Sequence, residues 1–143
     1  MTLTRILVSA IALIATTAIT ATLTSCSSST ADGVLLGRFF AAARLRDHTS
    51  LQTFATVSFE PNVQGIITDF EITNVTPERQ DGALVSKDVS ISAPVQLPTG
   101  QTAQKNFVIT MQRARPGRDP NVTPGWTITA ITEAQAAVSS PRS

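Results

Sequence analysis

The sequence predicts an α+β fold, in which an N-terminal helix and a short second helix pack on a curved antiparallel sheet of about four strands. Three observations lead to this prediction. Apolar residues recur first at helical spacing, the period then changes to strict alternation, and turn-forming residues separate the alternating segments. A helix followed by consecutive strands that share one apolar face is packed most simply as two layers.

The first helix is expected to begin at Asp32, a residue type suited to the N-cap, and to fade near Asp47. A shorter second helix, starting at about residue 49, should direct Leu51 and Phe54 inward. The apolar stripe of the first helix follows i, i+3 and i+4 spacing and consists of Leu35, Leu36, Phe39, Phe40 and Ala43. The helix therefore needs an apolar surface to lie on.

Four strands are expected after a break at Glu60-Pro61-Asn62. Their ranges are 67–75, 83–97, 102–113 and 126–132. The turn between the first two is assigned to Pro77–Gly82. The second strand has the clearest alternation in the chain, and only Lys87 interrupts its apolar face. Such alternation is typical of an antiparallel sheet with one buried face and one face in water.

The N-terminal segment, residues 1–25, is expected to be a signal peptide. Arg5 precedes a mainly apolar run, 6–19, which would form about 21 Å of helix and is too short for a bilayer core of roughly 30 Å. A positive start, a short apolar middle and small residues at the end are the parts of a secretory leader.

The leader ends in Leu23-Thr24-Ser25-Cys26, which contains the one cysteine of the chain. This motif resembles the lipobox of bacterial lipoproteins: an aliphatic residue, two small residues and a cysteine. The resemblance implies that Cys26 is acylated and becomes the N-terminus, with residues 26–31 as a short Ser-rich tether. The alternative is an ordinary secreted protein with an accidental cysteine.

Two or three acyl chains anchor a protein stably to a membrane. The resemblance therefore implies a membrane-anchored lipoprotein of the bacterial cell envelope. Ser27, rather than Asp, follows the cysteine. In a bacterium with two membranes, this residue favours the periplasmic face of the outer membrane over the inner membrane.

Further residues resemble the nuclear transport factor 2-like (NTF2-like) domains. Phe40, Ala43, Asp47, Leu51 and Phe54 have the spacing of the helix and short helical turn that open such domains. Gly125-Trp126-Thr127-Ile128 resembles their last strand. The resemblance implies one domain over 32–137, a cone-shaped sheet that wraps the first helix, and a flexible tail at 138–143.

Composition argues against several function classes. Eleven basic and ten acidic residues nearly balance, so no overall field attracts nucleic acid. Tyr is absent, and a single His and a single Cys argue against a zinc site. No catalytic residue and no cofactor site can be assigned, because neither a nucleophile–base set nor a glycine-rich phosphate loop is recognisable.

Arg113, Arg115 and Arg118 form a candidate contact patch in the loop before the last strand. They could meet anionic lipid headgroups or an acidic partner. Alternatively, this is an ordinary solvated loop whose charge Asp119 partly offsets.

The leading functional hypothesis is a non-enzymatic, lipid-anchored binding or assembly module with an envelope protein as its partner. The alternative is a small-ligand carrier or an enzyme with a pocket between helix and sheet and His48 or an acidic residue at its mouth. Buried polar groups around a cavity would favour this alternative. An interior filled with Phe39, Phe40, Val89, Ile91 and Ile109 would favour the module. A purely structural role at the membrane is a third possibility.

Overall fold

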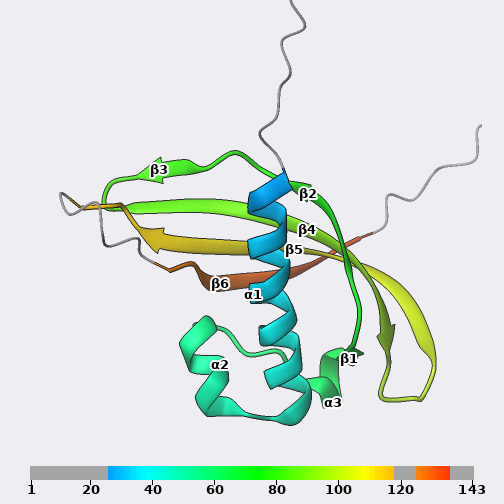
Figure 1. Ribbon diagram of the computed structural model, residues 1–143. Helices are drawn as coiled ribbons and strands as arrows, with labels where there is room; N and C mark the ends of the chain where they lie inside the picture. Colours follow the sequence, from blue (N-terminus) through cyan, green and yellow to red (C-terminus); the bar gives the residue numbers. More distant parts are fainter. Residues whose placement is uncertain (1–25, 118–124, 136–143) are drawn as a thin grey trace, which may run out of the picture.

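A computed structural model describes residues 26–117 and 125–135 of the chain. Within these ranges the protein is α+β: short and long helices pack on a strongly curled antiparallel sheet that forms a half-barrel (Figure 1). The fold class predicted from the sequence is therefore confirmed at this level.

The sheet is organised by two long strands, β4 (Leu84–Gln96) and β5 (Thr102–Ala114). They pair antiparallel along their whole length, and β6 (Thr127–Ala134) adds to the other edge of β5. In β4 the alternate residues are buried, as the sequence pattern predicted. The curl of this sheet gives it a concave face, which the helices cover (Figure 1).

The other edge of β4 carries three short strands instead of the one expected over 67–75. They are β1 (Ile66–Ile67), β2 (Glu71–Val75) and β3 (Arg79–Asp81), and each pairs antiparallel with β4. Ladder pairing is interrupted between β1 and β2, where the carboxylate of Asp69 accepts a hydrogen bond from the Phe70 backbone N–H at 2.9 Å. The prediction of a single strand was wrong here.

The assignment of Pro77–Gly82 wholly to a turn was also wrong. Its middle residues form β3 and continue along the edge of β4, and Gly82, with a φ of 57°, makes the tight turn back. The six strands nevertheless occupy four rows, because β1, β2 and β3 lie one after another beside β4.

The first helix, α1 (Cys26–Leu45), begins six residues before the expected position. Asp32 is therefore not an N-cap. It lies inside the helix, where its side chain is buried and points at the sheet. Residues 26–31, expected to form the lipidated N-terminus and a short tether, belong to the first turns of α1.

The core lies between α1 and the concave face of the sheet. Phe39, Phe40, Val89, Ile91 and Ile109 are all at most 4% exposed and belong to one hydrophobic cluster. The ring of Phe40 lies within 6 Å of three other rings, those of Phe39, Phe59 and Phe70. These side chains therefore pack together in the interior between α1 and the sheet.

The short second helix was predicted correctly. It is α2 (His48–Phe54), its N-cap is Asp47, and it buries Leu51. The carboxylate of Asp47 accepts a hydrogen bond from the backbone N–H of Ser50 at 3.1 Å and another from the Ser50 hydroxyl. A third, four-residue helix, α3 (Pro61–Gln64), occupies the place expected to be only a break.

The Asp47 cap leads to a prediction about pH. The hydrogen bonds from Ser50, that of its hydroxyl first, favour the ionised carboxylate and lower the pKa of Asp47 below its ordinary value of 3.8. A folded-state pKa below the unfolded one adds stability that is present above about pH 4 and is lost as the pH falls through the folded pKa. Asp47→Asn keeps an acceptor but cannot titrate. The stability difference between wild type and this variant should therefore shrink on acidification.

Urea unfolding of both proteins between pH 6 and pH 2.5 measures this difference. An NMR titration of the Asp47 carboxyl carbon provides the direct check, and a midpoint at or above 3.8 would contradict the prediction.

Candidate functional site

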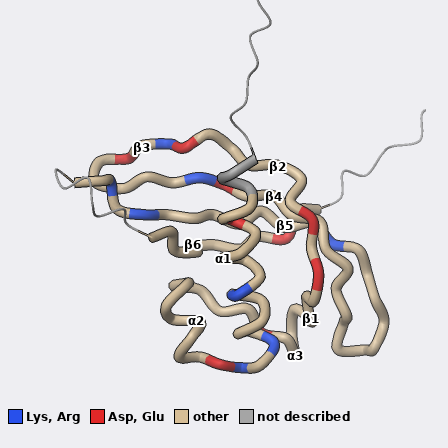
Figure 2. The backbone as a smooth tube through the Cα atoms, viewed as in Figure 1, with Lys and Arg blue, Asp and Glu red and all other residues tan. Residues whose placement is uncertain are grey.

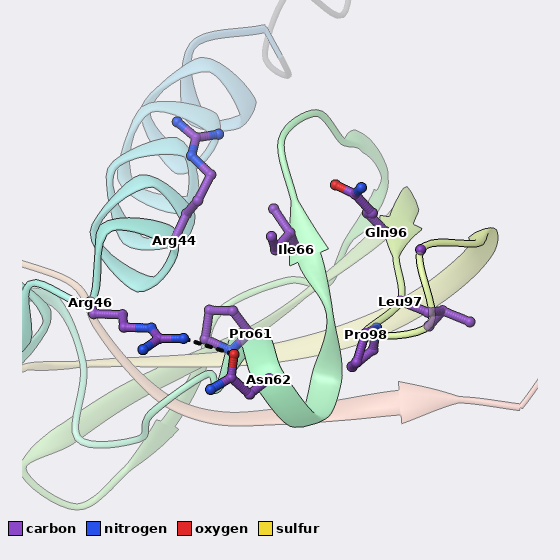
Figure 3. Close-up of a pocket in the computed structure, with 9 residues that line it drawn as sticks. Arg44, Arg46, Pro61, Asn62, Ile66, Gln96, Leu97 and Pro98 are labelled. Carbon is purple, nitrogen blue, oxygen red and sulfur yellow. Dashed lines mark hydrogen bonds between the residues drawn. The ribbon is translucent and has the colours of Figure 1, made fainter.

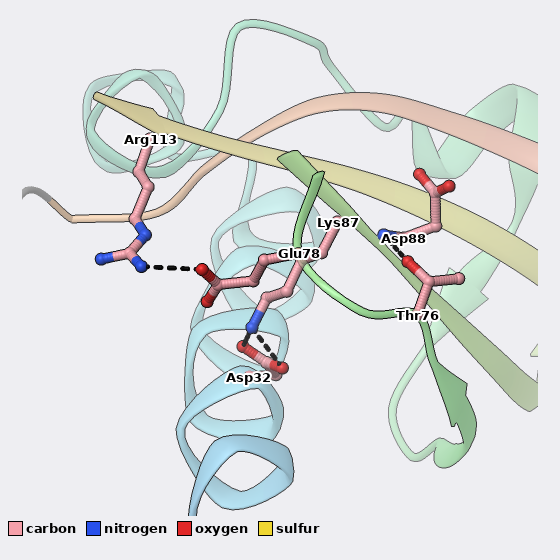
Figure 4. A network of polar contacts seen from close by, with 6 residues as sticks. All are labelled: Asp32, Thr76, Glu78, Lys87, Asp88 and Arg113. Atoms are coloured by element: carbon pink, nitrogen blue, oxygen red, sulfur yellow. Dashed lines mark hydrogen bonds and ion pairs between the residues drawn. The ribbon is translucent and has the colours of Figure 1, made fainter. Parts of the chain in front are cut away.

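A buried ion pair joins α1 to the sheet. The Nζ of Lys87 donates to both carboxylate oxygens of Asp32, at 2.7 and 2.8 Å, and the two side chains are 5% and 2% exposed (Figure 4). Lys87 occupies an inward position of β4 between Val85 and Val89, which are both buried. Because neither charge is exposed to water, each depends on the other for neutralisation.

Trp126 lies beside this pair and beside a second cation. Its ring centroid is 4.4 Å from the Nζ of Lys87 and 4.8 Å from the guanidinium carbon of Arg113. Arg113 in turn donates to Glu78 at 2.9 Å, and its Nε is buried with no hydrogen-bond partner in the described part of the chain. Lys87 and Arg113 thus each combine an ionic contact with a cation–π contact to the same ring.

This cluster was not predicted from the sequence, although a signal for it exists. Asp32 precedes Leu36 and Phe39 by four and seven residues, so it lies on the apolar stripe of the helix. Lys87 lies on the apolar face of the strand. A charged residue on a face that must be buried needs a partner of opposite charge. The positions of Asp32 and Lys87 therefore indicate that the two side chains pair with each other.

The predicted arginine patch is divided in the structure. Arg113 has a 15% exposed side chain that is engaged by Glu78 and Trp126, so it does not offer a free charge to a partner. Arg115 is exposed, and Arg118 lies outside the described residues. Of the three arginines of the predicted contact patch, only Arg115 is both described by the structure and exposed.

Cys26 is the first residue of α1. The predicted signal peptide, residues 1–25, and the predicted tail, 138–143, lie outside the described residues. Among the helices that the structure describes, none combines the length and apolar character needed to cross a bilayer.

The single histidine of the chain and two acidic residues in or beside β2 are exposed. His48 is the first residue of α2, and Asp69 and Glu71 lie on the wet side of the β1–β2 edge, opposite the half-buried Phe70 and Ile72. Within 26–117 and 125–135, no group of three or more His, Cys, Asp and Glu side chains is arranged to hold a metal ion.

A groove of about 540 Å³ lies at the end of α1 that is distant from Cys26 (Figure 3). It runs between the end of α1, α3, β1 and the turn that joins β4 to β5. Its lining residues are Arg44, Arg46, Pro61, Asn62, Ile66, Gln96, Leu97, Pro98 and Gly100. The groove therefore combines two cations and two amides with an apolar surface.

The two arginines are held differently. A guanidinium N–H of Arg46 donates to the Oδ1 of Asn62 at 2.8 Å, which fixes its direction across the groove (Figure 3). The side chain of Arg44 extends along α1 and has no hydrogen-bonding or ionic partner among the described residues. Basic positions are visible at the end of α1 beside α3 (Figure 2).

Arg46 also has an unusual backbone. Its φ is 56°, and it is the one non-glycine residue with a positive φ in the described ranges. It follows α1 directly: its N–H bonds to the carbonyl of Ala43, and the next N–H, from Asp47, bonds to Ala42. This is a Schellman-type helix end, at which glycine is the usual residue.

The chain was also compared with known proteins. A scan against protein-family models finds no matching family, and searches of curated proteins and of solved structures return no significant match.

Proposed function

We propose that this protein is a lipid-anchored binding or assembly module of the bacterial cell envelope, acylated at Cys26 after removal of residues 1–25. The lipobox-like motif before Cys26 supports the anchor. The proposed location is the periplasmic face of an outer membrane where the cell has one, because Ser27 follows the cysteine.

The filled interior is the observation that favours a binding module over a ligand carrier or an enzyme with an internal pocket. The large side chains that would fill the interior of a binding module, among them Phe39, Ile91 and Ile109, are fully buried in one core. The members of the buried polar pair Asp32–Lys87 satisfy each other through hydrogen bonds. Recognition is therefore expected at the surface of the domain.

The length of α1 supports this arrangement. Its 20 residues span about 30 Å, with Cys26 at one end and the arginine groove beside the other. With Cys26 at the bilayer, the groove would lie away from the lipid and be accessible to a soluble ligand or partner. Because α1 starts at Cys26 itself, little chain is left to act as a flexible linker.

An NTF2-like cone is the finer fold that we propose. The order of a long helix, a short helix and a curled antiparallel sheet supports it, as does Trp126 directly before β6. Phe40 and Leu51, two residues of the resemblance, are buried in α1 and α2 as a helical opening of this type requires.

Metabolic labelling with palmitate in a bacterial host tests the anchor. We expect label on the full-length wild-type protein and recovery of that protein in the membrane fraction. Cys26→Ser should remove the label, because the thiol is the acyl acceptor.

A relocated cysteine provides the matched control. Cys26→Ser combined with Ser29→Cys keeps one thiol three residues later but takes it away from the Leu-Thr-Ser sequence, so we expect no label. An unlabelled wild-type protein would refute the anchor, and equal labelling of the relocated cysteine would refute the role of the motif.

A further inference from the structure

We propose that the groove at the end of α1 binds an organic carboxylate that carries a compact apolar group, with Arg44 and Arg46 as the carboxylate receptors. This proposal specifies the ligand chemistry of the binding function proposed above. It does not require Cys26 to be acylated, so the labelling and binding experiments can fail independently.

The size and lining of the groove suit such a ligand. A volume of about 540 Å³ lies within the range of roughly 300–1,000 Å³ that is typical of small-molecule sites. Pro61, Ile66 and Leu97 provide apolar contact, and the arginines lie on the α1 side. A ligand with one anionic end and one apolar end matches this division.

The charge of the groove is not neutralised by its own lining. No acidic residue lines it, although Asp47 and Glu60 are close in sequence. Asp47 is engaged as the cap of α2 by the backbone and hydroxyl of Ser50. Guanidinium groups bind carboxylates through paired, charge-assisted hydrogen bonds, so two of them beside an apolar surface favour an anionic guest.

The backbone of Arg46 is the second, independent observation. A left-handed conformation is unfavourable for a residue with a Cβ, and glycine would adopt it without this cost. The arginine at this position is also directed by Asn62. Strained residues that are held in place by their surroundings are concentrated at functional sites.

The presence of Arg44 and Arg46 at the end of α1 also has a purely structural explanation, which predicts a different result for their replacement. Cations near a helix C-terminus interact favourably with the helix dipole, which would account for Arg44 and Arg46 without any ligand. In that case replacing either one would change stability and leave no binding to lose. The two explanations therefore differ in a binding measurement.

Binding can be measured by ¹H–¹⁵N NMR on the full-length, purified protein in a neutral detergent. The probes are isovalerate, N-acetylvaline and the uncharged N-acetylvalinamide. We expect saturable shifts for the amides of Ile66, Gln96 and Gly100 with the two acids, with a Kd on the order of 1 mM for such small ligands. Tighter binding of N-acetylvaline would identify a peptide C-terminus as the source of the carboxylate, and tighter binding of isovalerate a free acid.

Three variants separate binding from stability. Arg44→Gln and Arg46→Gly should each weaken acid binding about tenfold, because each removes a charge-assisted contact. Arg46→Gly should at the same time leave the urea midpoint unchanged or raise it, because glycine suits the left-handed position. Arg38→Gln is the control, since Arg38 is exposed on the same helix and does not line the groove.

Loss of binding in Arg44→Gln and Arg46→Gly, with retention in Arg38→Gln, would support the proposal. Three results would overturn it: no saturable shifts with either acid, equal binding of the uncharged amide, or equal loss of binding in Arg38→Gln. Undiminished binding by a stably folded Arg46→Gly protein would remove Arg46 from the site.

Discussion

Replacing Lys87 with methionine is expected to destabilise the domain by about 3–5 kcal/mol, because the Asp32 carboxylate would be left buried and uncompensated. The substitution removes the ammonium that binds both carboxylate oxygens and also one of the two cations on the Trp126 ring. Methionine has a similar length, so lost packing contributes little. Urea unfolding followed by Trp126 fluorescence measures the effect.

Lys105→Met is the matched control. Lys105 also forms a lysine–carboxylate contact at 2.8 Å, with Glu133, but these side chains are 23% and 52% exposed. Exposed pairs contribute about 0–1 kcal/mol, so this variant should remain close to wild type. Equal costs for Lys87→Met and Lys105→Met would contradict the assignment of a buried pair.

The double variant Asp32→Leu, Lys87→Met distinguishes the net contribution of the ion pair to stability from the penalty of leaving one buried charge without its partner. Apolar replacements of both members avoid the stranded charge and continue the apolar stripe of α1 and the inward face of β4. We expect most of the stability lost in Lys87→Met to return, since apolar replacement of a buried pair is often neutral or stabilising. A double variant as unstable as the single one would argue against this interpretation.

Gly65→Ala is the second substitution with a large expected effect. Gly65 has φ 94° and ψ −177°, a region almost restricted to glycine. A Cβ there would lie 2.5 Å from the Cγ1 of Val95 and 2.7 Å from the carbonyl oxygen of Gln96. Backbone strain and overpacking together should cost about 3 kcal/mol or more and displace β1 from β4.

Gly82→Ala tests backbone conformation without crowding. Gly82 also has a positive φ, 57°, but a Cβ there meets no atom within 4 Å. The expected cost is about 1 kcal/mol, close to the intrinsic penalty of the left-handed region. Chemical denaturation gives the free energy of unfolding of both variants. If Gly65→Ala were no less stable than Gly82→Ala, the close approach of Val95 and Gln96 to residue 65 would be contradicted.

Residue periodicity within one segment correctly predicted the long helix and the long strand. The alternation of β4 and the apolar stripe of α1 each report one buried face, and both are confirmed. Asp47 was recognised near a helix boundary, and it caps α2. The start of α1 was misplaced because Asp32 is a good cap by type, whereas its actual partner, Lys87, is 55 residues away.

The groove could not be predicted in the same way. Three stretches that are separate in sequence, 44–46, 61–66 and 96–100, bring its residues together, and no local spacing reports that assembly. The edge of β4 was missed for a related reason. β3 is three residues long and fully exposed, so it has no apolar periodicity, and its pairing depends on the partner strand.

The divided edge beside β4 would matter if the protein is anchored as proposed, because anchored copies would be crowded on one membrane surface. A long, regular edge strand exposes a row of unpaired N–H and C=O groups to which a second sheet can add. Here no segment of that edge exceeds five residues, a bulge interrupts β2, and Arg79 and Asp81 place charges along β3. These breaks protect neighbouring copies against edge-to-edge aggregation.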